Sequence, residues 1–212
     1  MYINQCSYFV APNPITDFNK TSVYPTIHNS SFIGPFSCII GNVTIEENVF
    51  IASNVSIRAD EGTPFYIGSG TNIQDGTIFH GLANSTINYE NNNYSIYLSD
   101  NVTCAHKCVI HGPCFIGSKV FIGFNSTVFN AIIEENTYIS SGAIVTGGVK
   151  INPGRFVPTG ALIDTQEKAD ALECVSQNEI DFVEDILHCN HQYPEAYLKL
   201  FKDNALVKSP NF

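Results

Sequence analysis

The chain has 212 residues, of which 44% are hydrophobic and only 14% are charged, against roughly 25% charged residues in an average soluble domain. Ten basic and twenty acidic side chains give a formal net charge of −10 without a basic patch, which argues against nucleic acid or an anionic membrane as partner. A surface so poor in charge indicates that another subunit covers part of it.

The start of the chain shows no targeting signal, because residues 1–5 lack the basic and apolar regions of a signal peptide. No run of about 18 apolar residues, the length needed to cross a membrane, follows. The cysteines form no Cys-x-x-Cys pair, so we expect most of them to be reduced, buried and small hydrophobic residues. These features predict a cytoplasmic protein.

Apolar residues recur with a period of six from residue 27 to residue 163. Insertions after Ile57 and Phe79 and a one-residue deletion after Val128 interrupt the series. Its members are Ile27, Ile33, Ile39, Ile45, Ile51, Ile57, Ile67, Ile73, Phe79, Leu98, Cys104, Ile110, Ile116, Ile122, Val128, Ile133, Ile139, Val145, Ile151, Val157 and Ile163. This period fits neither an α-helix nor a simple amphipathic strand.

A period of six is typical of a parallel β-helix of hexapeptide repeats, in which three short strands form each triangular coil. The apolar residue of each repeat points inward, and the Gly, Asn, Asp and Ser residues beside it turn the corners. We therefore predict an all-β triangular prism over residues 1–164, including an N-terminal lead-in. The similarity to hexapeptide-repeat proteins implies that the prism is left-handed.

The pattern becomes helical from about residue 165. Ser176 to Glu179 form a capping-box sequence, and apolar residues at helical spacing follow. Pro194 is expected to end this helix or to open a second, short one. We predict that residues 165–212 form a C-terminal helical segment that packs along the prism and helps to hold a trimer together.

Three of the six histidines fall in one region of the repeat: His80, His106 and His111. His80 and His111 each follow an inward residue, so if residues 81–97 form an extruded loop, His111 stacks directly above His80. His106 lies on the preceding face and points away, but it can join the pair across a subunit boundary. Three imidazoles with one open position are typical of a catalytic zinc site, so we predict His₃ sites between the subunits of a trimer.

The segments around these histidines resemble those of gamma-class carbonic anhydrases. The motifs are Ile57-Arg58-Ala59-Asp60-Glu61-Gly62, Asn72-Ile73-Gln74-Asp75-Gly76, Ala105-His106 and His111-Gly112-Pro113. Residues 121–131 and 156–160 are also similar to the amino-terminal domain of the carboxysome scaffold protein that shares this fold. The resemblance covers roughly residues 15–203.

The resemblance implies a homotrimer that hydrates carbon dioxide to bicarbonate with Zn²⁺, while Fe²⁺ or Co²⁺ would also fit three imidazoles. By the same resemblance, Gln74 orients the metal-bound hydroxide, Glu61 accepts or relays the proton, and Asn72 borders the substrate pocket. Arg58 and Asp75 are implied to pair across the subunit interface, with Asp60 nearby.

Two features depart from the family pattern. The segment 81–97, which in some gamma enzymes carries an acidic proton shuttle, is short and Asn-rich, and Glu90 is its only acid. A Tyr and an Asn on the family's C-terminal helix align approximately with Val183 and Asp185, which do not match. We therefore expect slow or buffer-dependent proton export.

Two other functions remain compatible with the sequence. A hexapeptide acyltransferase needs one histidine as general base and a cofactor groove, and acetyl-CoA binding would identify it. A non-catalytic trimeric scaffold domain, associated with carboxysomes, would keep zinc without turnover. These 212 residues carry no appended Rubisco-binding repeats, so we expect less than a complete scaffold.

Overall fold

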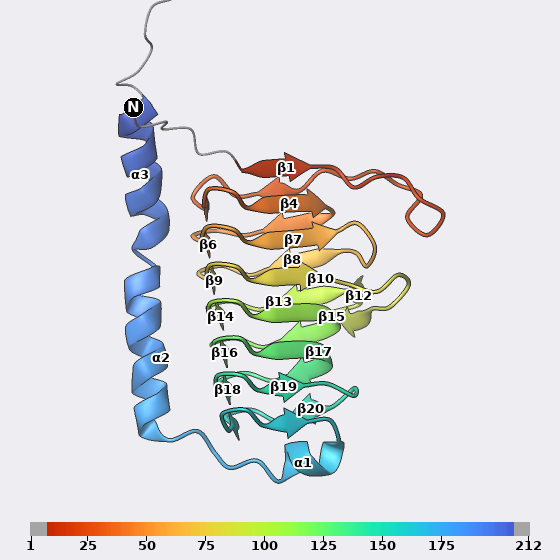
Figure 1. Cartoon of the computed structure of the whole chain (residues 1–212), viewed down its shortest axis with the longest axis vertical. Coiled ribbons are helices and arrows are strands. Elements are labelled where there is room, and N and C mark those ends of the chain that lie inside the picture. Colours follow the sequence, from red (N-terminus) through yellow and green to blue (C-terminus); the bar gives the residue numbers. More distant parts are fainter. Residues whose placement is uncertain (1–7, 206–212) are drawn as a thin grey trace, which may run out of the picture.

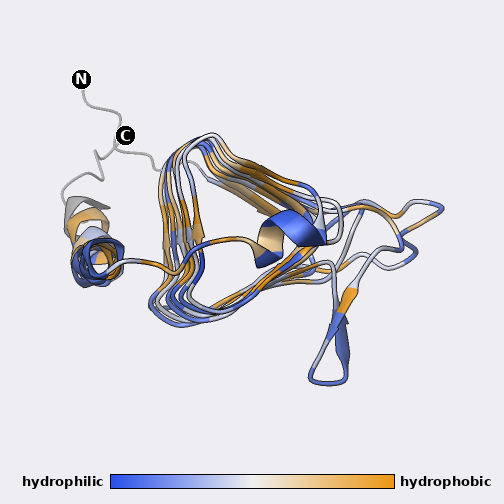
Figure 2. Ribbon diagram, turned by 90° about the horizontal axis from the view of Figure 1, so that it is seen from below, coloured by the Kyte–Doolittle hydropathy of each residue, from blue (hydrophilic) through white to orange (hydrophobic). Residues whose placement is uncertain are grey.

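The computed structural model describes the backbone of residues 8–205 and the side chains up to residue 201. The chain forms a three-sided prism of stacked β coils, with two long helices beside one side (Figure 1). Seen along the axis of the prism, the coils superimpose as a triangle (Figure 2). The predicted β-helix of hexapeptide repeats is confirmed.

Successive strands fall on three faces, and each face is a ladder of parallel strands. The first face contains β1 (Phe9–Ala11), β4 (Cys38–Gly41), β7 (Ser56–Ala59), β10 (Ile78–His80), β19 (Ile144–Val145) and β22 (Leu162–Ile163). The second contains β2 (Thr26–Ile27), β5 (Val43–Ile45), β8 (Phe65–Ile67), β13 (Ile96–Leu98) and β20 (Lys150–Ile151). Two long strands, β15 (Val109–Ile116) and β17 (Thr127–Ile133), run from the first face onto the second. The third face contains β3 (Phe32–Ile33), β6 (Phe50–Ile51), β9 (Asn72–Ile73), β14 (Thr103–Cys104), β16 (Phe121–Ile122), β18 (Tyr138–Ile139) and β21 (Phe156–Val157).

The apolar residues of the repeat fill the inside of the prism. All of them are at most 9% exposed except Ile27, which is half-buried. Burying one such aliphatic side chain stabilises the fold by about 1.5–3 kcal/mol. At the corner between the third and first faces, Asn54, Gly76, Lys107 and Asn125 adopt φ angles from 56° to 73°, which turn the chain sharply.

Three helices follow the last strand: α1 (Gln166–Asp170), α2 (Gln177–Asn190) and α3 (Tyr193–Ala205). The predicted capping box between Ser176 and Glu179 is confirmed at the start of α2. A second helix begins at Tyr193, directly before Pro194, which agrees with one of the two expectations, but this helix is longer than predicted. None of the described helices is long and apolar enough to cross a membrane. Residues 206–212 of the predicted helical segment lie outside the described residues.

The helices α2 and α3 cover the third face. Phe182 of α2 contacts Phe121, with ring centroids 5.6 Å apart, and Tyr193 of α3 contacts Phe50 at 5.2 Å. The side of α2 that faces the sheet buries Val183, Leu187 and Asn190.

Three segments project from the corner between the first and second faces: residues 12–24, 60–64 and 81–95 (Figure 2). The last of these was expected to be a loop, but it contains an antiparallel hairpin of β11 (Ile87–Tyr89) and β12 (Asn92–Tyr94). Tyr89 and Tyr94 pack on Tyr97 of the second face, with ring centroids 4.4 and 5.0 Å apart. These ring contacts hold the hairpin against the prism.

The C-terminal end of the prism is closed by side-chain and loop groups. The Gln166 amide of α1 accepts from Lys150 N at 2.9 Å and donates to Lys150 O at 2.8 Å, as a neighbouring strand would. On the third face, Phe156 N donates to Glu173 O at 2.9 Å. The last strands of the second and third faces therefore find hydrogen-bond partners outside the repeat.

The cysteines of the described chain are all free. The expected burial holds for Cys104, Cys108 and Cys114 but is wrong for Cys174 and Cys189, which are exposed; Cys38 is half-buried and Cys6 lies outside the described residues. Burial raises the pKa of the Cys108 thiol to about 12 and raises the pKa values of the Cys104 and Cys114 thiols as well.

Candidate metal centre

His80 and His111 lie side by side at the end of the first face. The strands β10 and β15 pair with His80 opposite His111, as the repeat register predicts. His80 Nδ1 lies 3.4 Å from His111 Nε2, and both side chains are half-buried.

The second ring nitrogen of His111 indicates its tautomer. Nδ1 lies 3.0 Å from the carbonyl oxygen of Gly112. A carbonyl oxygen only accepts, so in the neutral ring Nδ1 carries the proton and Nε2 presents its lone pair to His80. Two nitrogens bound tetrahedrally to one zinc at about 2.0–2.1 Å lie about 3.4 Å apart. The spacing of the pair and the free lone pair of His111 fit two ligands of one metal ion.

Charged residues around the 60–64 segment surround the other nitrogen of His80. Nε2 lies 3.3 Å from Asp60 Oδ1, 3.9 Å from Glu61 Oε2 and 3.3 Å from Arg58 Nη2. Arg58 Nε also lies 3.4 Å from Asp60 Oδ2. Asp60 Oδ1 is buried and makes no well-directed hydrogen bond within the described part of the chain. With a proton on Nε2, His80 would donate to this oxygen in place of accepting from Arg58 Nη2, and Nδ1 would be left to bind a metal.

Glu61 is held in place by the segment that follows His80. Its Oε1 accepts from Ala83 N at 3.3 Å, and Gly62 N donates to Gly81 O at 3.1 Å. The 12–24 segment adds a contact from Asn19 Nδ2 to Asp60 O at 3.4 Å. The neighbouring projections thus fix one carboxylate oxygen and leave Glu61 Oε2 beside His80.

His106 sits at the corner where the third face turns into the first. Its Nδ1 lies 3.1 Å from Asp75 Oδ2, and the other Asp75 oxygen accepts from Ser53 N at 3.2 Å. Nε2 has no hydrogen-bond partner among the described residues. A carboxylate on one nitrogen and an open lone pair on the other are usual for a metal-binding histidine.

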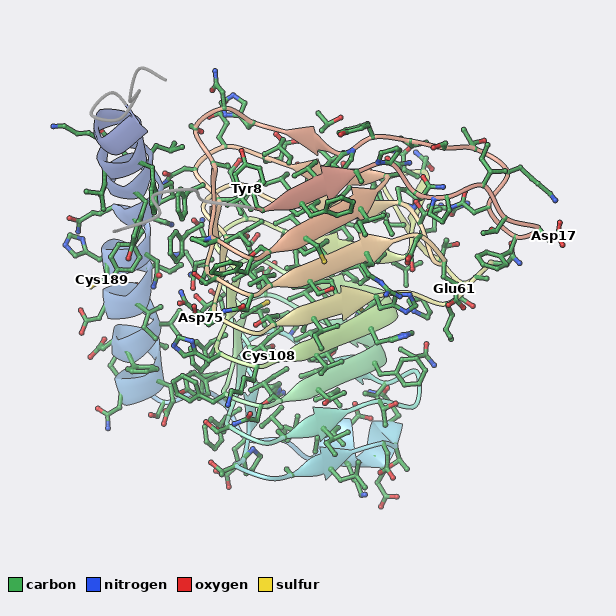
Figure 3. The ribbon with its side chains drawn as sticks, turned by 45° about the horizontal axis from the view of Figure 1, so that its top comes forward. Tyr8, Asp17, Glu61, Asp75, Cys108 and Cys189 are labelled. Atoms are coloured by element: carbon green, nitrogen blue, oxygen red, sulfur yellow. The ribbon has the colours of Figure 1, made fainter. Side chains whose placement is uncertain are left out.

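The three histidines do not meet within one chain. His106 lies where the first face begins (the corner edge), whereas His80 and His111 lie where it ends (the insertion edge). Figure 3 shows Asp75 and Glu61, which accompany the two groups, on opposite sides of the prism. In the described part of the chain no three His, Cys, Asp or Glu side chains converge as a metal site. The prediction that His106 points away from the pair agrees with this arrangement.

Gln74 is oriented by a chain of amide hydrogen bonds. Its Nε2 donates to Asn72 Oδ1 at 3.1 Å and to Asn190 Oδ1 at 2.8 Å, so both amide hydrogens are used. Asn72 in turn donates to Thr103 Oγ1 at 2.8 Å, and Asn190 donates to Ile186 O at 2.9 Å. Gln74 Oε1 is thereby left as an acceptor.

A cleft with a volume of about 300 Å³ lies between the third face and α2. His106, Gln74 and Asn72 are among its polar lining residues. Phe124, Phe182 and Ile186 provide apolar lining. The cleft can therefore hold a small molecule between polar groups and an apolar wall.

Two residues near the junction of α2 and α3 reach the cleft. Val183 packs into the core, whereas Asn190 bonds Gln74 and Tyr193 lines the same cleft. Neither residue was singled out from the sequence, because spacing alone does not connect Asn190 or Tyr193 to residue 74.

Arg58 and Asp75, implied to pair across an interface, each have a partner in their own chain. Arg58 contacts Asp60 and His80 at the insertion edge, and Asp75 contacts His106 at the corner edge. They lie at opposite edges of the first face, so any contact between them would need a second chain.

Comparisons with known proteins identify relatives that share the repeat and relatives that are carbonic anhydrases. The family model "Bacterial transferase hexapeptide (six repeats)" matches residues 24–59. The chain is 35% identical to a carbonic anhydrase of Methanosarcina thermophila, covering 80% of the chain and 72% of the relative. It is 41% identical to the carboxysome assembly protein CcmM of Nostoc sp., covering 87% of the chain. It is also 32% identical to a mitochondrial gamma carbonic anhydrase of Arabidopsis thaliana, over 63% of the chain.

The chain spans only 33% of the Nostoc CcmM protein. Among solved structures, an acetyltransferase-like protein of Bacillus cereus aligns with a TM-score of 0.73 over 91% of this chain and 98% of its own, at 24% identity. A hexapeptide transferase family protein of Anaplasma phagocytophilum aligns with a TM-score of 0.67 over 82% of this chain and 93% of its own, at 24% identity. At this identity the two structures establish the shared fold alone.

Proposed function

The chain belongs to the gamma-class carbonic anhydrase family of hexapeptide-repeat proteins, and we propose that it hydrates carbon dioxide to bicarbonate at zinc sites shared between the subunits of a homotrimer. The observation that carries the proposal is the divided set of histidines. His80 and His111 lie at metal-ligand spacing at one edge of the first face. His106 lies at the other edge, with Nδ1 beside Asp75 and Nε2 open.

The surface of the first face supports a second copy of the chain as the partner. Ile78, Ile144 and Leu162 point outward from it and are 44–46% exposed, although they are large aliphatic residues. Ile78 lies two residues before His80 on the same strand, so one of these apolar residues is close to a proposed ligand. Packing this face against the corner edge of a neighbour would bury the three residues and complete a His₃ site.

The ligands would be His80 and His111 of one subunit and His106 of its neighbour. A zinc ion bound there would supply Lewis acidity and lower the pKa of its bound water to about 7. Fe²⁺ or Co²⁺ would suit the same neutral imidazoles.

The residues around the proposed ligands would orient the nucleophile, hold the substrate and accept the proton. Gln74 lines the cleft with Oε1 left as an acceptor, and this oxygen would accept a hydrogen bond from the hydroxyl group that attacks carbon dioxide and so orient it. The apolar wall of Phe124, Phe182 and Ile186 holds the substrate and excludes water. Glu61 Oε2, beside His80, accepts the proton that must leave on each turnover.

The CcmM relatives support a carboxysome-associated location in the cytoplasm and a second candidate role. In that role, the trimer would be a scaffold domain that keeps the metal and lacks turnover. The segment 81–97 favours slow turnover, because Glu90 is its only acid and the hairpin is held to the prism by ring contacts.

The test is stopped-flow carbon dioxide hydration on anaerobically purified protein, with metal content measured in the same sample and imidazole varied as buffer. One metal ion per chain with buffer-dependent hydration is the expected result. Full metal content without hydration at any buffer concentration would favour the scaffold role. Absence of bound metal would refute both.

A further inference from the structure

Each of the two histidines on neighbouring corners is followed by a phenylalanine one full coil later. Phe124 lies 18 residues after His106, and Phe129 lies 18 residues after His111. Three hexapeptides make one coil, so each phenylalanine occupies the position of its histidine in the next coil. The hydrogen bond from Asn125 N to His106 O, 3.1 Å, and the pairing of His111 with Phe129 confirm this register.

Phe124 lies flat against the His106 ring. Their centroids are 5.7 Å apart and their planes differ by 6°. Asp75 occupies the same corner one coil earlier, as the bond from Lys107 N to Asp75 O at 2.9 Å shows, and it contacts His106 Nδ1. The imidazole is therefore held by a carboxylate at its edge and by a phenyl ring on its face.

Phe129 contacts His111 in a different way. The ring centroids are 5.1 Å apart and the planes are nearly perpendicular, at 89°. Gly112 O holds Nδ1 of the same ring at 3.0 Å. Each imidazole thus has an oxygen partner on Nδ1 and a phenylalanine ring beside it, and this combination leaves the Nε2 lone pair for a metal.

A packing role alone does not explain Phe124. Its side chain is 44% exposed and is absent from the hydrophobic core, so its removal leaves no internal cavity. Orientation of the ring on which it stacks is the contribution that its geometry supports.

We propose that Phe124 and Phe129 are positioning residues that orient His106 and His111 for metal binding, an inference that rests on the proposed metal site. Orienting groups around metal ligands commonly contribute 10–100-fold to affinity. The aromatic partners should therefore affect metal affinity more than they affect folding.

The test measures zinc affinity of the assembled protein by competition with a chromophoric chelator. We expect Phe124→Ala to weaken zinc binding by about 10-fold, Phe129→Ala to weaken it by a similar factor, and Phe124→Tyr to stay near wild type because it keeps the ring. Phe36→Ala, which removes a phenylalanine that is 70% exposed at the same corner of an earlier coil, should have no effect.

Thermal unfolding of the metal-free variants separates orientation from folding. Equal midpoints for the wild type and Phe124→Ala, together with weaker zinc binding, would support the proposal. If Phe124→Ala lowers the midpoint, Phe124→Leu, which retains apolar volume without a flat ring, should still bind zinc more weakly. Wild-type affinity in Phe124→Ala would overturn the proposal and leave the function intact, whereas a wild-type protein that binds no zinc would overturn both.

Discussion

The two edges of the first face build their polar sites in different ways. At the corner edge, where no segment is inserted, Ser53, Asp75, His106 and Phe124 occupy equivalent positions in successive coils, and the stacking of the coils brings them together. At the insertion edge, His80 and His111 follow the repeat, but their charged neighbours come from projecting segments. A β-helix can thus place metal ligands by the register of its repeat alone. The groups proposed for proton transfer lie in segments that depart from the repeat.

Removing one histidine from each edge should have the largest effect. His106→Ala and His111→Ala should each weaken zinc binding by more than about 100-fold, because a direct ligand contributes more than its orienting partners. Mixing the two variants under verified subunit exchange should restore about one quarter of the sites, since the ligands come from different chains. Metal content after exchange measures this, and no recovery would contradict a site shared between the two edges.

Alkaline pH should lower the folding stability at both edges together. Cys104, Cys108 and Cys114 are buried inside the coil that joins these edges. Their folded-state pKa values are raised by burial, so the native thiols stay protonated while thiols of the unfolded chain ionise. Stability is therefore full below about pH 8.5 and falls as the pH rises, by about 2 kcal/mol per thiol at pH 10. Urea unfolding between pH 8 and 10 measures the slope, which Cys108→Ala should reduce even if its overall stability is lower.

Releasing Gln74 from its hydrogen bond at the corner edge should reduce carbon dioxide hydration without loss of bound metal. Asn190→Ala removes the acceptor that holds Gln74 Nε2 at 2.8 Å. We expect kcat/KM for hydration to fall about tenfold, the equivalent of about 1.4 kcal/mol, with zinc content unchanged. Asn178→Ala, at an exposed position of the same helix, is the matched control. Equal losses in the two variants would mean that the effect comes from the helix and not from Gln74.

Loosening the hairpin should give the smallest effect, confined to the insertion edge. Tyr89→Ala removes a ring that packs on Tyr97 and Phe115. The Ala83 contact to Glu61 should then become mobile, and hydration should fall about threefold, a loss below about 1 kcal/mol, at low buffer concentration. High imidazole should reverse the loss, and Tyr89→Phe should behave as wild type. A loss that imidazole does not reverse would argue against a role in proton transfer.

The regular parts of the molecule were predictable from the sequence because one period controls them. The inward ladder and the stacking of His80 on His111 follow from counting in sixes. The contact of Asn190 with Gln74 was not predictable, because it depends on the path of residues 164–176 and on how α2 docks. The hairpin was missed for a related reason, since its tyrosines are held by rings on the second face rather than by a pattern of their own.

The cap at the C-terminal end of the prism has a consequence for self-association. A parallel β ladder that ends abruptly offers its backbone to any extended chain, which is how fibrils grow. The side-chain amide of Gln166 bonds both the backbone N and the backbone O of Lys150. A side-chain amide offers no second row of backbone groups with which another strand could pair. Growth by end-to-end addition of prisms is therefore blocked on that ladder, and Gln166→Ala would expose a template for fibre formation.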